Sequence, residues 1–298
     1  MKQFTLEGYE KYKERKGQVD VVPTSIPSLN DLIGGGLRTR NFYVLLASTG
    51  VGKTTTMMGF MLDVLESGKK VAFLSIDEED QYEVAERVSC MHNRVRYEQL
   101  VDGSISDEDF EKVDHFITHE LAENAEIYFS RDPFAYRTEI IDEAGKAKKV
   151  TYREIDVILS NMKENNIKYL FIDYLGAIIT EEQSKMYSKL AEYSSELKTY
   201  ASENNCMIFT SMQANRELKK AMKQSDFDVT LVDESFMADS IGPARKATVC
   251  LSLIKQKGER NTATLNVFKN RLNGQNGHIK ITIDPLSLRW DEFYDFEA

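Results

Sequence analysis

The sequence is poor in cysteine and proline and has no long apolar run. Its three cysteines, Cys90, Cys206 and Cys250, lie far apart, which argues against a disulfide framework or a metal site and favours reduced thiols in the cytoplasm. With only 5 prolines, no Gly/Ser-rich tract and no repeat, a flexible linker between domains is not expected. No segment approaches the roughly 18 apolar residues of a membrane span. Residues 1–17 are too polar for a signal peptide.

An excess of basic residues is also missing. The formal net charge is −10, and 29% of the residues are charged and 42% hydrophobic, as in globular proteins with a substantial core. This balance argues against a surface coated with nucleic acid. It leaves room for a local basic channel, because electrostatic attraction falls off over about 8–10 Å.

Apolar runs predict the buried strands of an α/β fold. They span residues 42–46, 71–76, 169–172, 207–210 and 249–254. Helical patterns lie between them, so we expect a mainly parallel sheet flanked by helices. The final segment, 262–290, alternates around two Asn-Gly pairs and predicts a C-terminal antiparallel β-hairpin.

Residues 81–165 are predicted to be mostly helical, with a hairpin near 142–146. Two capping boxes, which begin at Ser106 and Thr151, are expected to start helices there. Upstream, Ser28 is expected to cap a short helix. Residues 4–16 mix apolar and charged side chains and predict an amphipathic helix that needs a surface to pack on.

The strongest motif is a glycine-containing loop between a predicted strand and a predicted helix. It reads Ala47-Ser48-Thr49-Gly50-Val51-Gly52-Lys53-Thr54 and continues into Thr55. Gly50 and Gly52 let backbone N–H groups surround phosphates, and the helix N-terminus adds partial positive charge. Lys53 would neutralise the β- and γ-phosphates, and Thr54 would offer its hydroxyl to Mg²⁺. We therefore predict that residues 48–55 bind ATP and Mg²⁺.

Carboxylates follow two of the predicted strands. Asp173 ends the third run, and at the carboxyl end of a parallel strand it would lie beside the phosphates and hold Mg²⁺. Asp77 and Glu78 end the second run, and one of them is predicted to orient the attacking water. The alternative is that both are solvated loop acids, because Glu79 and Asp80 follow them.

Gln213 follows the fourth run. It is predicted to sense the γ-phosphate and to report it to residues 214–246. That segment carries several cations, including Arg216, Lys219 and Lys220, and a solvated loop would explain them as well.

Two further pairs carry charge or metal-ligand chemistry. Lys269 and Arg271 lie two residues apart on a predicted strand, so their side chains point the same way and could reach a phosphate on a neighbouring subunit. His115 and His119 are four apart on a predicted helix. No third ligand has a matching spacing, so we interpret them as surface residues.

In this order the motifs resemble the motor of DnaB-type replicative helicases, which are RecA-like ring ATPases. The resemblance covers residues 24–285. It rests on Ile26-Pro27-Ser28-Leu29-Asn30 with Gly34-Gly35-Gly36-Leu37, on Phe73-Leu74-Ser75-Ile76-Asp77-Glu78, on Phe171-Ile172-Asp173-Tyr174-Leu175, on Gln213-Ala214-Asn215-Arg216 and on Lys269-Asn270-Arg271.

The resemblance implies a RecA-like ATPase core in residues 21–298, preceded by a helix or linker in residues 1–20 that docks on the next subunit. It implies an ATP-driven DNA helicase that forms a ring, expected to be a hexamer, around single-stranded DNA. Asp77 or Glu78 would supply the catalytic acid, Gln213 the sensor, and Lys269 with Arg271 a finger acting on the neighbouring subunit. The DNA contacts would come from Arg216, Lys219, Lys220, Ser240 and Gly242.

The same resemblance makes a primase or a helicase loader an expected partner, and a compact motor of this kind is typical of phage-encoded enzymes. The sequence departs from the family pattern at positions that bear on the rate of hydrolysis and on DNA contact. Ala47 replaces a glycine, Asp77 stands at the glutamate position, Gly176 replaces a glutamine, and the loop around Ser240 lacks an arginine.

Two rival functions stay open. A RecA-like recombinase or annealing ATPase would form open filaments on DNA, and particle shape distinguishes it from a ring. A regulatory ATPase or helicase loader would bind protein and unwind nothing, and DNA-stimulated ATPase activity distinguishes it from a motor.

Overall fold

The computed structural model describes residues 5–7, 9–10, 13, 18–76, 79–143, 146–177, 183–224, 227–238, 241–255 and 258–293. Asp77, Glu78 and Ser240 lie outside these residues. Within the expected N-terminal helix, the described residues Leu6, Glu7, Tyr9, Glu10 and Lys13 are helical and exposed.

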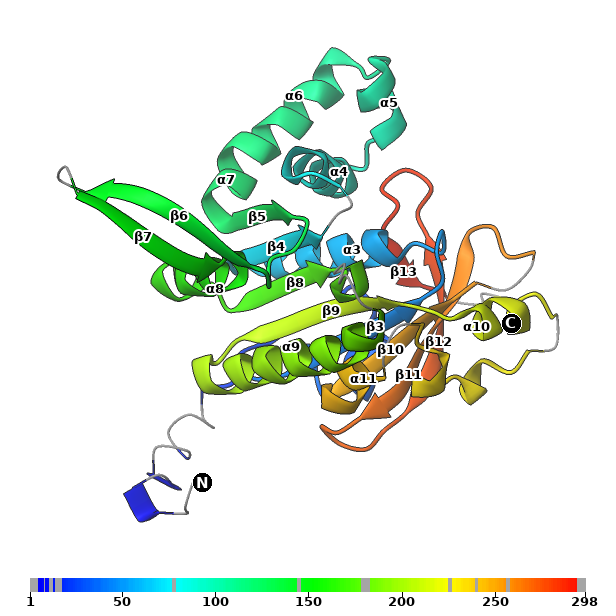
Figure 1. The fold of residues 1–298 in the computed structure, drawn as a ribbon. Helices are drawn as coiled ribbons and strands as arrows, with labels where there is room; N and C mark the ends of the chain where they lie inside the picture. Colours follow the sequence, from blue (N-terminus) through cyan, green and yellow to red (C-terminus); the bar gives the residue numbers. More distant parts are fainter. Residues whose placement is uncertain are drawn as a thin grey trace.

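A large mixed sheet forms the centre of the described chain (Figure 1). Its order is β13-β12-β11-β10-β3-β9-β8-β4-β5. The strands from β10 to β5 are parallel, and β11 to β13 run antiparallel beside β10. Their bounds are β3 Phe42–Ala47, β4 Val71–Ile76, β5 Ala125–Ser130, β8 Tyr169–Asp173, β9 Met207–Gln213, β10 Val249–Ile254, β11 Thr262–Asn270, β12 Gly277–Ile283 and β13 Trp290–Glu292.

Helices cover both faces because the central strands are buried on both sides. Successive residues of β3 show this: Leu45 packs with α3 (Lys53–Glu66) in one core, and Leu46 packs with α9 (Gln183–Asn204) in the other. The remaining α-helices are α2 Pro27–Leu32, α4 Gln81–Asn93, α5 Tyr97–Asp102, α6 Asp107–His115, α7 Ala122–Asn124, α8 Glu154–Glu164, α10 Arg216–Ala221 and α11 Gly242–Lys246. No helix in the described ranges is long and apolar enough to cross a membrane.

Two small antiparallel pairs lie outside the main sheet. β1 (Val21–Val22) pairs with β2 (Leu37–Arg38), next to α2. β6 (Tyr136–Glu143) pairs with β7 (Lys146–Arg153), and this hairpin projects away from the sheet (Figure 1).

The predicted strands are all present, and the C-terminal antiparallel strands are confirmed. The hairpin near 142–146 is confirmed but is longer than expected, and β5 was not predicted. Two capping assignments were wrong. Ile26 precedes α2, where no side chain caps the helix, and Ser28 lies inside it, bonded to Glu292. Thr151 lies in β7, whereas Ser106 caps α6 by accepting from the N–H of Asp109 over 3.2 Å.

Candidate nucleotide site

The predicted glycine-containing loop, here called the P-loop, joins the end of β3 at Ala47 to the start of α3 at Lys53. Gly50 (φ +79°) and Gly52 (φ +104°) adopt the left-handed conformation that favours glycine. A Cβ on Gly52 would also lie 3.5 Å from the Trp290 ring, which packs beneath the loop. Gly52 is the N-cap of α3, and no side chain of the described residues caps this helix. The positive end of α3 therefore faces the loop, as phosphate binding requires.

Asp173 ends β8 and is buried directly beside the P-loop. Its carboxylate accepts from the Thr54 hydroxyl over 2.5 Å and from the Ser211 hydroxyl of β9 over 2.5 Å. The Lys53 ammonium lies 3.4 Å from the same carboxylate and 3.5 Å from the centre of the Tyr174 ring. The structure thus brings together the three residues for which the sequence predicted phosphate and magnesium chemistry.

These oxygen atoms suit a magnesium ion. Mg²⁺ in nucleotide sites takes one or two protein oxygens and fills its other positions with phosphates and water. Asp173 and Thr54 offer such a pair, already in contact. The described residues contain no cluster of three or more His, Cys, Asp or Glu that would form an all-protein metal site. The donor set therefore fits magnesium held jointly with a nucleotide.

A cleft of about 290 Å³ opens over this site. Gln213 lines it, because β9 runs beside β3 with Gln213 opposite Ala47. The Gln213 amide donates to the hydroxyl of Thr49 in the P-loop. The Lys219 ammonium of α10 lies 3.2 Å from the same hydroxyl. Lys219, for which the resemblance implied a DNA contact, is therefore at the P-loop.

Two cleft residues, Glu79 and Arg87, were missed from the sequence. Glu79 was given no role from the sequence, yet it lines the cleft and forms an ion pair with Arg87 of α4. The signal was present in the spacing. Asp80 caps α4 by accepting from the N–H groups of Tyr82 and Glu83. Arg87 lies about two helical turns further along α4, so it falls on the same face of the helix as the cap and the strand end.

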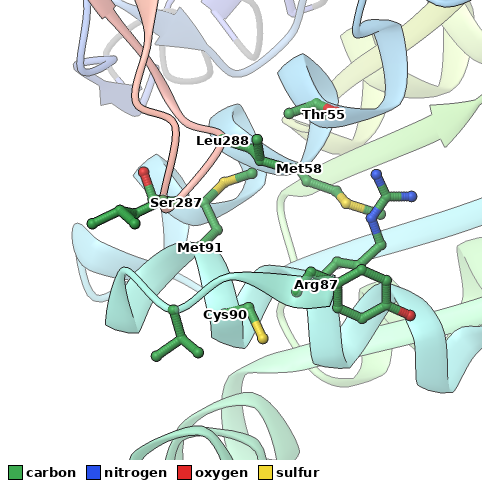
Figure 2. A pocket seen from close by; sticks show the side chains of 10 residues that line it. Thr55, Met58, Arg87, Cys90, Met91, Ser287 and Leu288 are labelled. Atoms are coloured by element: carbon green, nitrogen blue, oxygen red, sulfur yellow. The ribbon is translucent and has the colours of Figure 1, made fainter. Parts of the chain in front are cut away.

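A narrow apolar crevice continues from the cleft, with which it shares Thr55 and Arg87. Figure 2 shows side chains from α3, α4 and the loop before β13 meeting there. Its volume of about 10 Å³ has room for one water at most. The walls are formed by Thr55, Met58, Arg87, Cys90, Met91, Val95, Tyr97, Leu286, Ser287 and Leu288.

Lys269 and Arg271 lie at the other end of the sheet. Lys269 pairs with Cys250 at the start of β10 and donates its ammonium to the carbonyl of Ala244. The N–H of Arg271 bonds the carbonyl of Thr248. Burial and the nearby charges of Arg271, Lys269 and Lys246 lower the pKa of Lys198 on α9, so cations gather here.

The other expected DNA residues are dispersed. Arg216 and Lys220 are exposed on α10, and Gly242 is buried at the start of α11. Ser240 lies outside the described residues, as do the candidate acids Asp77 and Glu78. His115 and His119 stack on each other on the exposed side of α6 and the turn that follows it. The three cysteines are free and buried, and burial raises the pKa of each thiol.

The family model for the DnaB-like helicase C terminal domain matches residues 21–292. The chain belongs to this family. The replicative DNA helicase DnaB of Helicobacter pylori (strain ATCC 700392 / 26695) is 25% identical over 231 residues, which are 72% of this chain and 44% of the relative. The DnaB-like replicative helicase of Enterobacteria phage T4 is 24% identical over 239 residues, 78% of this chain and 46% of the relative. The chain thus spans about half the length of these curated relatives.

Two solved structures have the same fold. The first, described as an ATPase domain, superposes with a TM-score of 0.72 at 16% identity, over 97% of this chain and 97% of the other. The second, a DnaB-like replicative helicase described with its interactions with primase, superposes with a TM-score of 0.70 at 16% identity, over 97% of this chain and 67% of the other. The RecA-like architecture that the motifs implied is confirmed.

Proposed function

We propose that this chain is the ATP-driven motor of a replicative DNA helicase and that it works as a ring, with ATP between subunits. One observation carries the proposal. The phosphate-binding residues Lys53, Thr54 and Asp173 meet at one end of the sheet, whereas Lys269 and Arg271 lie at the other. A complete hydrolytic site then needs two copies of the chain.

Within one subunit, the Lys53 ammonium now lies beside Asp173 and the Tyr174 ring. When ATP binds, this ammonium would contact the β- and γ-phosphates instead. Thr54 and Asp173 would hold Mg²⁺, which neutralises the charge that develops on the phosphates. Ser211 would keep the Asp173 carboxylate in its orientation through the hydrogen bond it donates. Asp77 or Glu78 would orient the attacking water.

The base of the nucleotide would lie toward Arg87. Thr55 and Arg87 line both the phosphate cleft and the apolar crevice, so an extended nucleotide would run from one to the other. The crevice is too small for a base, so the loop that carries Leu286 and Leu288 would have to move outward. The flat guanidinium of Arg87 suits stacking on a base.

The neighbouring subunit would complete the site. Arg271 would stabilise the charge that develops on the γ-phosphate, with Lys269 beside it. Hydrolysis at each interface would then depend on how the two subunits are positioned. ATP hydrolysis could in this way be coupled to movement of one subunit relative to the next.

Single-stranded DNA would contact the exposed cations Arg216 and Lys220, together with Ser240 and Gly242. Similarity to a helicase described with primase, together with the family, supports a primase as partner. Residues 1–20 would link each motor to its neighbour. Cytoplasmic function accords with the reduced cysteines.

A fork-unwinding assay tests the function. Wild-type protein with ATP and Mg²⁺ should displace a strand from a fork with a single-stranded tail, and forks with 5′ or 3′ tails give the direction. Lys53→Ala should fold normally and displace nothing. Wild-type protein that hydrolyses ATP in response to DNA but forms filaments and displaces no strand would support a recombinase instead. ATPase activity that is indifferent to DNA would support a regulatory role.

A further inference from the structure

A single hydroxyl of the P-loop connects two segments that are distant in the chain. Thr49 Oγ1 accepts from the Gln213 side-chain amide and lies 3.2 Å from Lys219 Nζ. A hydroxyl oxygen has two acceptor positions, so it can take both bonds at once. The tip of the P-loop is therefore joined to the end of β9 and to α10.

The position of Lys219 follows from the structure that precedes it. Gln213 is level with Ala47, and the N–H of Ala214 bonds the carbonyl of Ala47 over 2.9 Å. Asn215 then caps α10, because its side-chain oxygen accepts from the N–H groups of residues 217 and 218. Leu218 is buried beneath the helix. Lys219 comes next and reaches the loop.

A second contact holds α10 against the P-loop. Met222 directly follows the helix, is buried, and its sulfur lies 3.5 Å from the Ser48 hydroxyl. The approach of Lys219 to the P-loop therefore accompanies a hydrogen bond that the Ser48 hydroxyl donates to the Met222 sulfur of the same segment.

No acid among the described residues pairs with the Lys219 ammonium. Over the part of the chain that the structure describes, Lys219 forms no ion pair, and Thr49 takes one of its three ammonium donors. Lys53, the other lysine at the loop, is beside Asp173. An ammonium at the tip of a phosphate-binding loop gains most from a phosphate oxygen, because charge-assisted hydrogen bonds are roughly twice as strong as neutral ones.

We propose that Lys219 is a second cation of the nucleotide site in the same subunit and that it binds the terminal phosphate of ATP. The inference rests on the proposed function and adds a residue to that site. Lys53 and Thr54 approach from the N-terminus of α3, whereas Lys219 approaches from α10 on the other side of the loop. ADP lacks the phosphate that Lys219 would bind, so α10 would be held more tightly with ATP than with ADP.

The chain provides a matched control. Lys223 follows the same short helix, is equally cationic, and is exposed as Lys219 is. The measurement is the equilibrium affinity of Lys219→Ala and Lys223→Ala for ATPγS and for ADP, each with Mg²⁺. Lys219→Ala should bind ATPγS on the order of tenfold more weakly and ADP normally, because one charge-assisted hydrogen bond is lost. Lys223→Ala should bind both normally, and Lys219→Arg should recover most of the affinity for ATPγS.

Two results would overturn the assignment. Equal weakening of ATPγS and ADP by Lys219→Ala would mean that the lysine only supports the loop. Normal nucleotide affinities together with a reduced salt dependence of single-stranded DNA binding would make Lys219 a DNA contact. Failure of the proposed function is a separate outcome, because it would appear as wild-type protein without ATPase activity.

Discussion

The backbone N–H of Arg271 donates to the carbonyl of Thr248 over 2.9 Å and fixes Arg271 at the end of the sheet opposite its own P-loop. The N–H of Thr248 in turn bonds the carbonyl of Phe42, at the start of β3. The P-loop follows Ala47 at the other end of that strand, on the order of 16 Å away at roughly 3.3 Å per residue. This separation is the physical reason to expect that Arg271 acts on the nucleotide of a neighbouring subunit.

Replacing Asp173 tests whether its negative charge, rather than its size, is needed for ATP hydrolysis. Asp173→Asn keeps the size of the side chain but removes the charge near Lys53 and the carboxylate oxygen for Mg²⁺. We expect ATP hydrolysis to fall roughly 100-fold or more, as measured by phosphate release at saturating ATP and Mg²⁺. A nearly normal rate would exclude Asp173 from the metal site.

A substitution at Ser211 tests whether its hydrogen bond positions the Asp173 carboxylate. Ser211→Ala removes a buried hydrogen bond to Asp173 and leaves the acid itself in place. We expect a fall in kcat of about tenfold, with little change in KM for ATP. Ser252 is also buried, but its hydroxyl has no hydrogen-bond partner among the described residues, so Ser252→Ala is a matched control that should keep its kcat. Equal rates for both variants would show that the Ser211 hydroxyl does not position Asp173.

The two candidate acids should behave differently. One carboxylate is enough to orient the attacking water, so we expect only one of Asp77 and Glu78 to be essential for hydrolysis. The longer reach of Glu78 favours it. Glu78→Gln should bind ATP but fail to hydrolyse it, and Asp77→Asn should hydrolyse at nearly the wild-type rate. The assignment fails if both variants turn over ATP normally, and Glu79, which lines the cleft, would be the next acid to replace.

The exposed cations of α10 should govern the salt dependence of DNA binding. Arg216→Ala with Lys220→Ala removes two phosphate contacts, so a plot of log affinity for single-stranded DNA against log salt should become shallower by about one to two. Titration by fluorescence anisotropy with a bound ATP analogue measures this slope. An unchanged slope would mean that DNA binds elsewhere on the motor.

The cysteines should react slowly in the folded protein. Burial raises the pKa of Cys90 and Cys206 to about 11, and it also raises the pKa of Cys250. The reactive thiolate is therefore scarce at pH 8, and alkylation should be on the order of 100-fold slower than in denaturant. Mass spectrometry after timed alkylation checks this. Rapid labelling of native protein at pH 8 would contradict the buried environment.

The sequence predicted best where one strong local signal was enough. The run 249–254 gave β10 without error, because a buried strand flanked by polar residues is a clear pattern. The P-loop was equally clear. β5 was missed because only its last residue is buried, so its sequence lacks the continuous apolar run of a central strand. Thr151 was assigned to a capping box although it pairs with Thr138 across a hairpin, since cross-strand pairing is not visible in local sequence.

Contacts between distant segments could not be predicted. Nothing near Ser211 indicates that it bonds Asp173, because the contact depends on the neighbouring positions of β8 and β9. From the sequence, Lys219 was grouped with the other cations of its segment. It differs from Lys220 only because α10 packs near the P-loop and brings Lys219 to Thr49.

Mixing two inactive variants tests the shared site most directly. Arg271→Ala should bind ATP nearly normally but hydrolyse it roughly 10³–10⁵-fold more slowly. Lys53→Ala should be inactive for lack of a functional P-loop. The readout is ATPase activity of the mixture under conditions where differently tagged subunits co-purify as mixed rings. Each preparation alone is the control. In a mixed ring some interfaces combine an intact P-loop with an intact Arg271, so activity should reappear and peak near equal proportions. Mixed rings that stay inactive at every proportion, or an Arg271→Ala protein that is fully active alone, would contradict a site shared between subunits.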